Sequence, residues 1–333
     1  MNGWIILADI ISSTIIFAVP LLVVALGGMF SERSGTINIA LEGIMIIGAL
    51  ASCLFLSAVN KSGWGISNPH LAMLLAILVA AGTGMIFSLL LAFASVSLKA
   101  DQTIGGTALN MFAPAFAIVL TWSIQGQGQS TIYIPAWIRL NPSTFGLDAT
   151  AATGFFGRLI FNYLYLTTPV VFLLLILTIF IIYKTRFGLR LRSCGEHPQA
   201  ADSVGINVYR YRYVGVMISG FLGGIGGLAF AIAAGSGFES SVAGYGFFAL
   251  AVMIFGNWNP VRIFGAALFF ALFRVIGSYS SSIPFLPSFA GVKSSQYIYQ
   301  MLPYIVTMIL LIFTSRKSRA PKAEGIPYDK GKR

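Results

Sequence analysis

The chain has 333 residues, of which 57% are hydrophobic and only 9% are charged. A water-soluble domain carries roughly 25% charged residues, so this composition excludes a soluble globular protein and predicts that lipid covers most of the surface. The formal net charge is +11, but the basic residues lie in short segments between apolar stretches and near the C-terminus. That distribution favours a membrane protein and argues against nucleic acid as a partner.

Apolar windows of the length that crosses a bilayer, roughly 20 residues, follow one another along the chain. They lie at about residues 5–28, 36–59, 71–98, 104–122, 164–183, 213–234, 243–257, 262–280 and 297–314. The alternation of a spanning strand is absent, and only helices and closed barrels satisfy their backbone in hydrocarbon. The sequence therefore predicts an all-α integral membrane protein of about nine transmembrane helices, with eight to ten as the range.

Lys and Arg concentrate on one side of these windows, as they do in cytoplasmic loops. They gather in a loop at 184–212 and in a tail at 315–333, and placing both in the cytoplasm leaves the uncharged N-terminus outside. We therefore expect one polytopic domain, residues 1–314, followed by a basic cytoplasmic tail. Arg274 remains within a window, where pairing with Asp9 or Glu239 and an outward turn of the side chain are the alternatives.

Two segments are alike and run in opposite directions across the predicted membrane. Gly35–Gly48 reads GTINIALEGIMIIG and Gly244–Gly256 reads GYGFFALAVMIFG. Opposed repeats of this kind place a substrate path at their interface in many transporters, while chance similarity between Gly-rich apolar segments is the alternative. The connection at 123–163 lies between them and is predicted to be external, either as an ordinary loop or as a docking surface for a binding protein.

The loop 184–212 contains a short predicted helix from Pro198 to Val204. Pro198 suits the first helical position, and Gly205 suits the residue just past the helix end. A start at Ser193, which forms a capping-box pattern with Glu196, would place Pro198 inside the helix and is disfavoured. The result is either a lever for a cytoplasmic partner or an incidental helix in a basic loop.

The stretch Cys194–Ile206 (CGEHPQAADSVGI) resembles the coupling loop of ABC importer permeases that carry sugars, branched-chain amino acids and nucleosides. The stretch Leu26–Ala49 (LGGMFSERSGTINIALEGIMIIGA) resembles the second-span signature of that family. Its residues are most similar to those of the nucleoside branch. The resemblance extends over nearly the whole chain.

The resemblance implies a division of labour. A lipoprotein of the basic-membrane-protein type would deliver a nucleoside outside, and two permeases, usually different chains, would form the path. A cytoplasmic ATPase would bind ATP and Mg²⁺ and grip the coupling loop; the residues concerned are Glu196, His197, Pro198, Ala200, Ala201, Asp202 and Gly205. This chain has no Gly-x-x-x-x-Gly-Lys-Ser/Thr phosphate loop, so we expect no enzyme activity and no cofactor on it.

Polar residues within the windows are the candidates for the path. Glu42 is costly in hydrocarbon and lies one helical turn after Asn38; the pair either lines the path or forms a structural hydrogen bond that holds a broken helix. Neutral amides suit a nucleoside, and Trp258 or Phe247 could stack on a base. The full candidate set is Asn38, Glu42, Gln102, Asn110, Asn257 and Trp258, with local capping or anchoring as the alternative for each.

The sixth window is rich in glycines spaced four apart, which allow close approach of helices. Gly220, Gly223, Gly224 and Gly227 are therefore expected to serve helix packing. Two rival functions remain beside the nucleoside permease: the same machinery carrying a pentose or other sugar, and an ion-coupled secondary transporter using Glu42 and Asp9. An intramembrane enzyme is disfavoured because His-Glu-x-x-His and Gly-x-Ser-x-Gly motifs are absent.

Overall fold

The computed structural model describes residues 3–146, 148, 154–235, 237–279, 301, 305–306, 308–309 and 320–331. Within these residues the fold is all-α, as predicted, and the only strand-like features are two isolated bridges, Ile132 with Phe238 and Arg139 with Tyr165. The helices are α1 (Gly3–Arg33), α2 (Leu41–Lys61), α3 (Trp64–Ser67), α4 (Pro69–Ala92), α5 (Gln102–Gln125), α6 (Phe155–Phe161), α7 (Thr167–Lys184), α8 (Arg186–Glu196), α9 (Pro198–Ser203), α10 (Val208–Ala234), α11 (Tyr245–Phe255) and α12 (Pro260–Ser278).

In the described part of the chain, 7 helices are long and apolar enough to cross a membrane: α1, α2, α4, α5, α7, α10 and α12. The predicted window 243–257 corresponds to α11, which has only 11 residues. At 1.5 Å per residue it is about 16 Å long, roughly half of a 30 Å hydrocarbon core. The window 297–314 lies almost entirely outside the described residues, so a count of nine is not confirmed.

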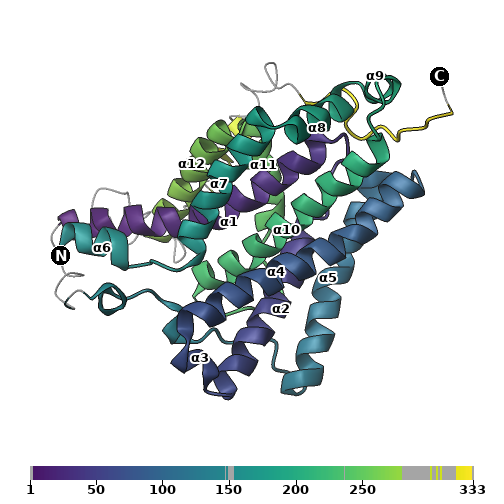
Figure 1. The fold of residues 1–333 in the computed structure, drawn as a ribbon. Helices are drawn as coiled ribbons and strands as arrows, with labels where there is room; N and C mark the ends of the chain where they lie inside the picture. The colour runs from purple at the N-terminus through teal and green to yellow at the C-terminus, as the bar shows by residue number, and fades with distance from the viewer. Residues whose placement is uncertain are drawn as a thin grey trace, which may run out of the picture.

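Helix α10 lies at the centre of the bundle and packs against α1, α2 and α4 (Figure 1). Its glycines make this possible, because a Cβ on Gly224 would overlap the Ala80 carbonyl of α4. A Cβ on Gly227 would overlap the Met45 carbonyl of α2, and Gly220 and Gly223 face Ser88 and Ile44 in the same way. The glycines of α10 therefore let its backbone contact the backbones of α2 and α4 directly.

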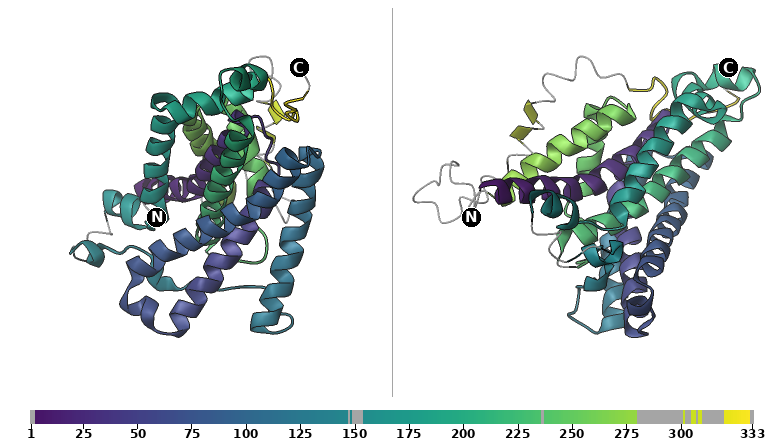
Figure 2. Two further views of the ribbon diagram at one scale, coloured as in Figure 1. Left: turned by 45° about the vertical axis from the view of Figure 1, so that its right-hand side comes forward. Right: turned by 60° about the vertical axis from the view of Figure 1, so that its left-hand side comes forward.

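Helix α5 stands at the edge of the bundle, and the left view of Figure 2 shows it beside α4 and α2 with no other described helix on its far side. It buries one stripe, formed by Gln102, Gly106, Ala113, Ala117 and Thr121. The opposite face is apolar and exposed, including Ile104 and Met111. Such a face is suited to lipid or to a neighbouring membrane helix.

Arg274 of α12 takes neither of the two expected carboxylate partners. Its guanidinium carbon lies 4.8 Å from the ring centroid of Tyr245 and 5.4 Å from that of Phe17, so cation–π contacts hold the charge inside the bundle. Asp9 is occupied elsewhere: its carboxylate lies 3.4 Å from Arg158 of α6 and accepts a 3.0 Å hydrogen bond from Asn162. These contacts tie the start of α1 to α6.

Candidate functional site

The Glu42 carboxylate lies at the start of two helices. It belongs to the first turn of α2, and its two oxygens accept hydrogen bonds from the backbone N–H groups of Gly244 (2.8 Å) and Gly246 (2.7 Å) at the start of α11. Helix N-termini attract negative charge, and backbone N–H donors satisfy a carboxylate well. Gly246 admits no side chain here, because a Cβ would collide with the Glu42 backbone.

The chain between α1 and α2 is non-helical from Ser34 to Ala40, so Asn38 lies before α2 rather than one turn earlier within it. Its amide nitrogen donates to the Ser219 hydroxyl of α10 at 2.8 Å. Irregular backbone at membrane depth must find hydrogen-bond partners within the protein. This break therefore depends on polar side chains from neighbouring helices.

Two candidate path residues of α5 supply those partners. Gln102 accepts a hydrogen bond from the backbone N–H of Ile37 at 2.6 Å. Asn110 accepts from the Gly43 N–H and donates to the Ile39 carbonyl, both at 2.8 Å. The structure thus gathers Asn38, Glu42, Gln102 and Asn110 around the breaks before α2 and α11, where their resolved bonds go to the chain itself.

Asn257 and Trp258 form the turn between α11 and α12, and both have φ near +51°. The Trp258 indole is buried and donates to the Glu32 carboxylate at 2.6 Å, while its carbonyl accepts from Arg33 at 3.0 Å. Trp258 therefore fastens the end of α11 to the end of α1 and is not available to stack on a base. Phe247 is half exposed and keeps that option.

The predicted coupling helix is α9, Pro198–Ser203, one residue shorter than expected, with Pro198 in its first turn and Gly205 at φ +82° just beyond it. One side of the helix is buried, with Pro198 and Ala201. Ala200 and the preceding residue His197 are exposed. Glu196 lies 4.0 Å from Arg33 at the end of α1.

Sequence reasoning missed α8, which occupies the basic arm before α9. Thr185 caps it by accepting a hydrogen bond from the Gly188 N–H at 3.2 Å. The apolar spacing Phe187, Leu191, Cys194 together with that cap is an amphipathic helix signal. Gly195, near its end, touches α1 so closely that a Cβ would overlap the Arg33 carbonyl.

The predicted tail does not stand apart from the coupling segment where the structure describes it (Figure 1). Residues 320–331 lie across α8, α9 and the start of α10, with Ala323 donating to the Gly195 carbonyl at 2.8 Å. Arg212, almost fully buried, donates to the Ile326 carbonyl at 2.8 Å. Lys330 pairs with Asp202 of α9 at 3.7 Å. The residues 315–319 and 332–333 lie outside the described part.

Two further contacts place the tail over the start of α10 and the end of α1. The Tyr328 ring packs on the Tyr209 ring of α10, with centroids 5.3 Å apart. The Glu324 carboxyl lies beside Glu32, and burial raises the pKa of Glu324 above its usual value of 4.5. The tail therefore brings a second acidic group to a buried carboxylate.

An all-α bundle of apolar helices, with two interrupted segments inside and a structured loop at one end, defines an integral membrane protein. The family model described as branched-chain amino acid transport system / permease component matches residues 10–314, and the chain belongs to this family.

Curated relatives match along the whole chain. The guanosine ABC transporter permease protein NupQ of Bacillus subtilis is 41% identical over 331 residues, 98% of each chain. The nucleoside ABC transporter permease protein NupC of Lactococcus lactis is 40% identical, covering 97% of each chain. NupB of the same Lactococcus, also a nucleoside ABC transporter permease protein, is 24% identical over 94% of this chain and 84% of its own. No solved structure gives a significant match.

Proposed function

We propose that this chain is the permease subunit of an ATP-driven ABC importer for nucleosides, resident in the cytoplasmic membrane. The observation that carries the proposal is the end-to-end similarity, at 41% and 40% identity, to NupQ and NupC. In this proposal the cargo passes through the membrane and no chemical bond in it is changed.

The experiment is uptake of radiolabelled nucleosides and ribose by cells that lack this chain, with and without its restoration. Restored nucleoside uptake that disappears when the partner ATPase is disabled is the expected result. Uptake of ribose alone would change the cargo to a pentose, and uptake indifferent to the ATPase would favour an ion-coupled transporter.

The proposed assembly contains three partners besides lipid: a cytoplasmic ATPase that binds ATP and Mg²⁺, an extracytoplasmic substrate-binding lipoprotein, and a second permease. The exposed face of α5 is the surface proposed for the second permease, because α5 is covered on one stripe only. Lactococcus lactis has two such permeases, NupC and NupB, which supports a paralogous second chain. The C-terminus would lie in the cytoplasm and the N-terminus outside.

In this proposal α9 transmits the movement of the ATPase. Its exposed residues His197 and Ala200 would contact the ATPase, and α8 and Glu196 connect α9 to the end of α1. From there Trp258 leads to the end of α11, whose start is held by Glu42. The chain of contacts runs from the coupling helix to the intramembrane breaks, and shifting it would open or close the path.

The path candidates acquire a specific role in this mechanism. We propose that Asn38, Glu42, Gln102 and Asn110 shape the path by holding its broken backbone, rather than by binding cargo. The coupling assignment is tested by Ala200→Arg, which should abolish ATPase association while leaving membrane insertion intact. Normal uptake by this variant would refute the assignment.

A further inference from the structure

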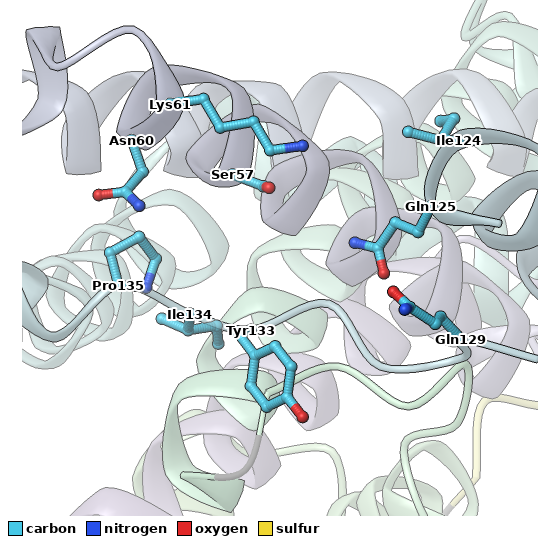
Figure 3. Close-up of a pocket in the computed structure, with 9 residues that line it drawn as sticks. All are labelled: Ser57, Asn60, Lys61, Ile124, Gln125, Gln129, Tyr133, Ile134 and Pro135. Carbon is cyan, nitrogen blue, oxygen red and sulfur yellow. The ribbon is translucent and has the colours of Figure 1, made fainter.

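At the end of the bundle opposite α8 and α9, the ends of α2 and α5 enclose a polar hollow of about 400 Å³ with the segment that follows α5 (Figure 3). That volume lies within the range of small-molecule sites. The hollow is lined by Ser57, Asn60, Lys61, Ile124, Gln125, Gln129, Tyr133, Ile134 and Pro135. It belongs to the side that the Lys/Arg distribution predicts to be external.

Several polar side chains of the hollow have no hydrogen-bond partner among the described residues. In the part of the chain that the structure describes, no hydrogen bond or ion pair engages the side chains of Ser57, Gln125 or Gln129. Asn60 accepts a 2.8 Å hydrogen bond from the Trp137 indole, which fixes its oxygen and leaves its NH₂ group to donate. Figure 3 shows the amides of Gln125 and Gln129 on the same side of the hollow, with Asn60 and Pro135 on the other side.

The lining selects a class of ligand. It contains no carboxylate, and Lys61 is its single charged group, so a cation is disfavoured. Amide and hydroxyl groups both donate and accept hydrogen bonds, which suits a neutral ligand with hydroxyls and ring nitrogens. The Tyr133 ring is 77% exposed, and with Ile134 and Pro135 it offers an apolar surface on which a flat heterocycle stacks. A pentose would leave this apolar surface unused.

The wall of the hollow is tied to the interior of the bundle. Between Gln129 and Tyr133, the backbone of Ile132 exchanges two hydrogen bonds with Phe238, at 2.9 and 3.0 Å. Both side chains are buried. Phe238 begins the irregular, non-helical segment that leads to Gly244, which donates to Glu42 together with Gly246 of α11. A ligand in the hollow therefore lies on a wall continuous with the break before α11.

We propose that this hollow is a receiving subsite for a nucleoside, occupied after release from the binding protein and before passage between the two permeases. The inference rests on the proposed nucleoside function and on the predicted orientation. It assigns hydrogen bonding to Gln125, Gln129 and Asn60, and base stacking to Tyr133.

The experiment compares the Gln125→Leu/Gln129→Leu double variant with Gln127→Leu in the complete importer. Gln127 is an exposed glutamine of the same segment that does not line the hollow. Losing two hydrogen bonds to the nucleoside predicts about a tenfold rise in the KM for nucleoside uptake, with Vmax retained. Gln127→Leu should leave KM unchanged.

Photolabelling with 5-azidouridine and 8-azidoadenosine in the same membranes supplies a direct readout. The label is expected within the peptide 124–135, suppressed by unlabelled nucleoside, unaffected by excess ribose, and lost in the double variant. A Gln129→Cys variant should react with a membrane-impermeant maleimide from outside; both native cysteines are buried. Reaction only from the cytoplasmic side would overturn the proposal.

The failures of the two proposals are distinguishable. If wild-type cells take up nucleosides and the double variant matches Gln127→Leu, the subsite is refuted and the nucleoside function stands. If wild-type cells take up no nucleoside, the proposed function fails first. If the double variant loses association with the binding protein and labelling never reaches this peptide, the hollow is a protein-docking surface and the subsite is refuted.

Discussion

Glu32 and Glu42 are buried carboxylates on either side of the break between α1 and α2, and the protein satisfies them in opposite ways. Glu42 receives backbone N–H donors from the start of α11. Glu32 receives one indole N–H from Trp258 and faces a second carboxyl group, Glu324 of the tail. The first arrangement is fixed by backbone geometry. The second depends on contacts made by the tail, which lies outside the helical bundle.

The largest effect is expected from Glu42→Leu, which removes the acceptor of two buried N–H groups. Each unsatisfied donor costs about 1–3 kcal/mol, and the start of α11 loses its attachment to α2. Thermal unfolding in detergent should shift markedly downward, and nucleoside uptake should be lost. Glu42→Gln, which keeps one carbonyl acceptor, should fall between. A fully stable and active Glu42→Leu protein would show that this carboxylate does not hold α11.

A variant truncated after Arg319 tests how much the tail contributes to the arrangement around Glu32. It loses the Ile326 acceptor of the buried Arg212, and an unpaired buried group of this kind costs about 1–3 kcal/mol. Association with the ATPase should weaken, because α8 loses the backbone hydrogen bond from Ala323 and α10 loses the packing of Tyr328 on Tyr209. Pull-down of the ATPase measures this loss.

The matched control for the truncation is Lys99→Ala/Lys330→Ala, which removes only the partly exposed ion pairs to Asp329 and Asp202. Such pairs contribute about 0–1 kcal/mol, so this variant should behave nearly as the wild type. If the truncated chain also associates normally, the tail is not part of the coupling surface.

The Trp258→Phe variant tests the indole hydrogen bond to Glu32 by itself. It keeps an aromatic ring in the turn and deletes the 2.6 Å hydrogen bond, for an expected loss of about 1.5 kcal/mol. The unfolding temperature should decrease slightly, and uptake should remain measurable. An unchanged unfolding temperature would mean that the indole contributes packing only.

The smallest effect concerns pH. Burial raises the pKa of Glu324 in the docked tail above 4.5, so docking binds a proton. Its stabilisation is fully present below the undocked pKa and is lost as pH rises through the docked value. A dye on Gly331→Cys should therefore become more mobile, by fluorescence anisotropy, as pH rises above about 4.5. Glu324→Gln should remove this dependence; an identical pH profile in that variant would assign the change to another group.

The sequence predicted what depends on local pattern. Apolar length located the spanning helices, because crossing a bilayer requires such length. Pro198 and Gly205 located α9, because each residue suits only one end of a short helix. The interruption at α11 was not predictable in this way, since the apolar window 243–257 does not show that its start is opened and held by Glu42, some 200 residues earlier.

The sequence predicted Asn38 and Gln102 as candidates for the path because neutral amides suit a nucleoside, and that role stays a prediction. The structure shows which groups of the chain these amides bind. Those partners, the Ser219 hydroxyl and the Ile37 N–H, are set by tertiary packing between distant helices. The docked tail was missed for a similar reason: its lysines indicate cytoplasm, whereas its contacts come from Ala323, Ile326 and Tyr328.

The short length of α11 has a consequence for biogenesis. The machinery that inserts nascent chains recognises apolar stretches of roughly 20 residues, and α11 has 11. We therefore expect α1 and α2 to be integrated first and to provide the Glu42 carboxylate on which α11 later settles. The interrupted segment would then acquire its final topology from the folded bundle rather than from the translocon. Mutations around Gly246 would therefore block folding at this late insertion step.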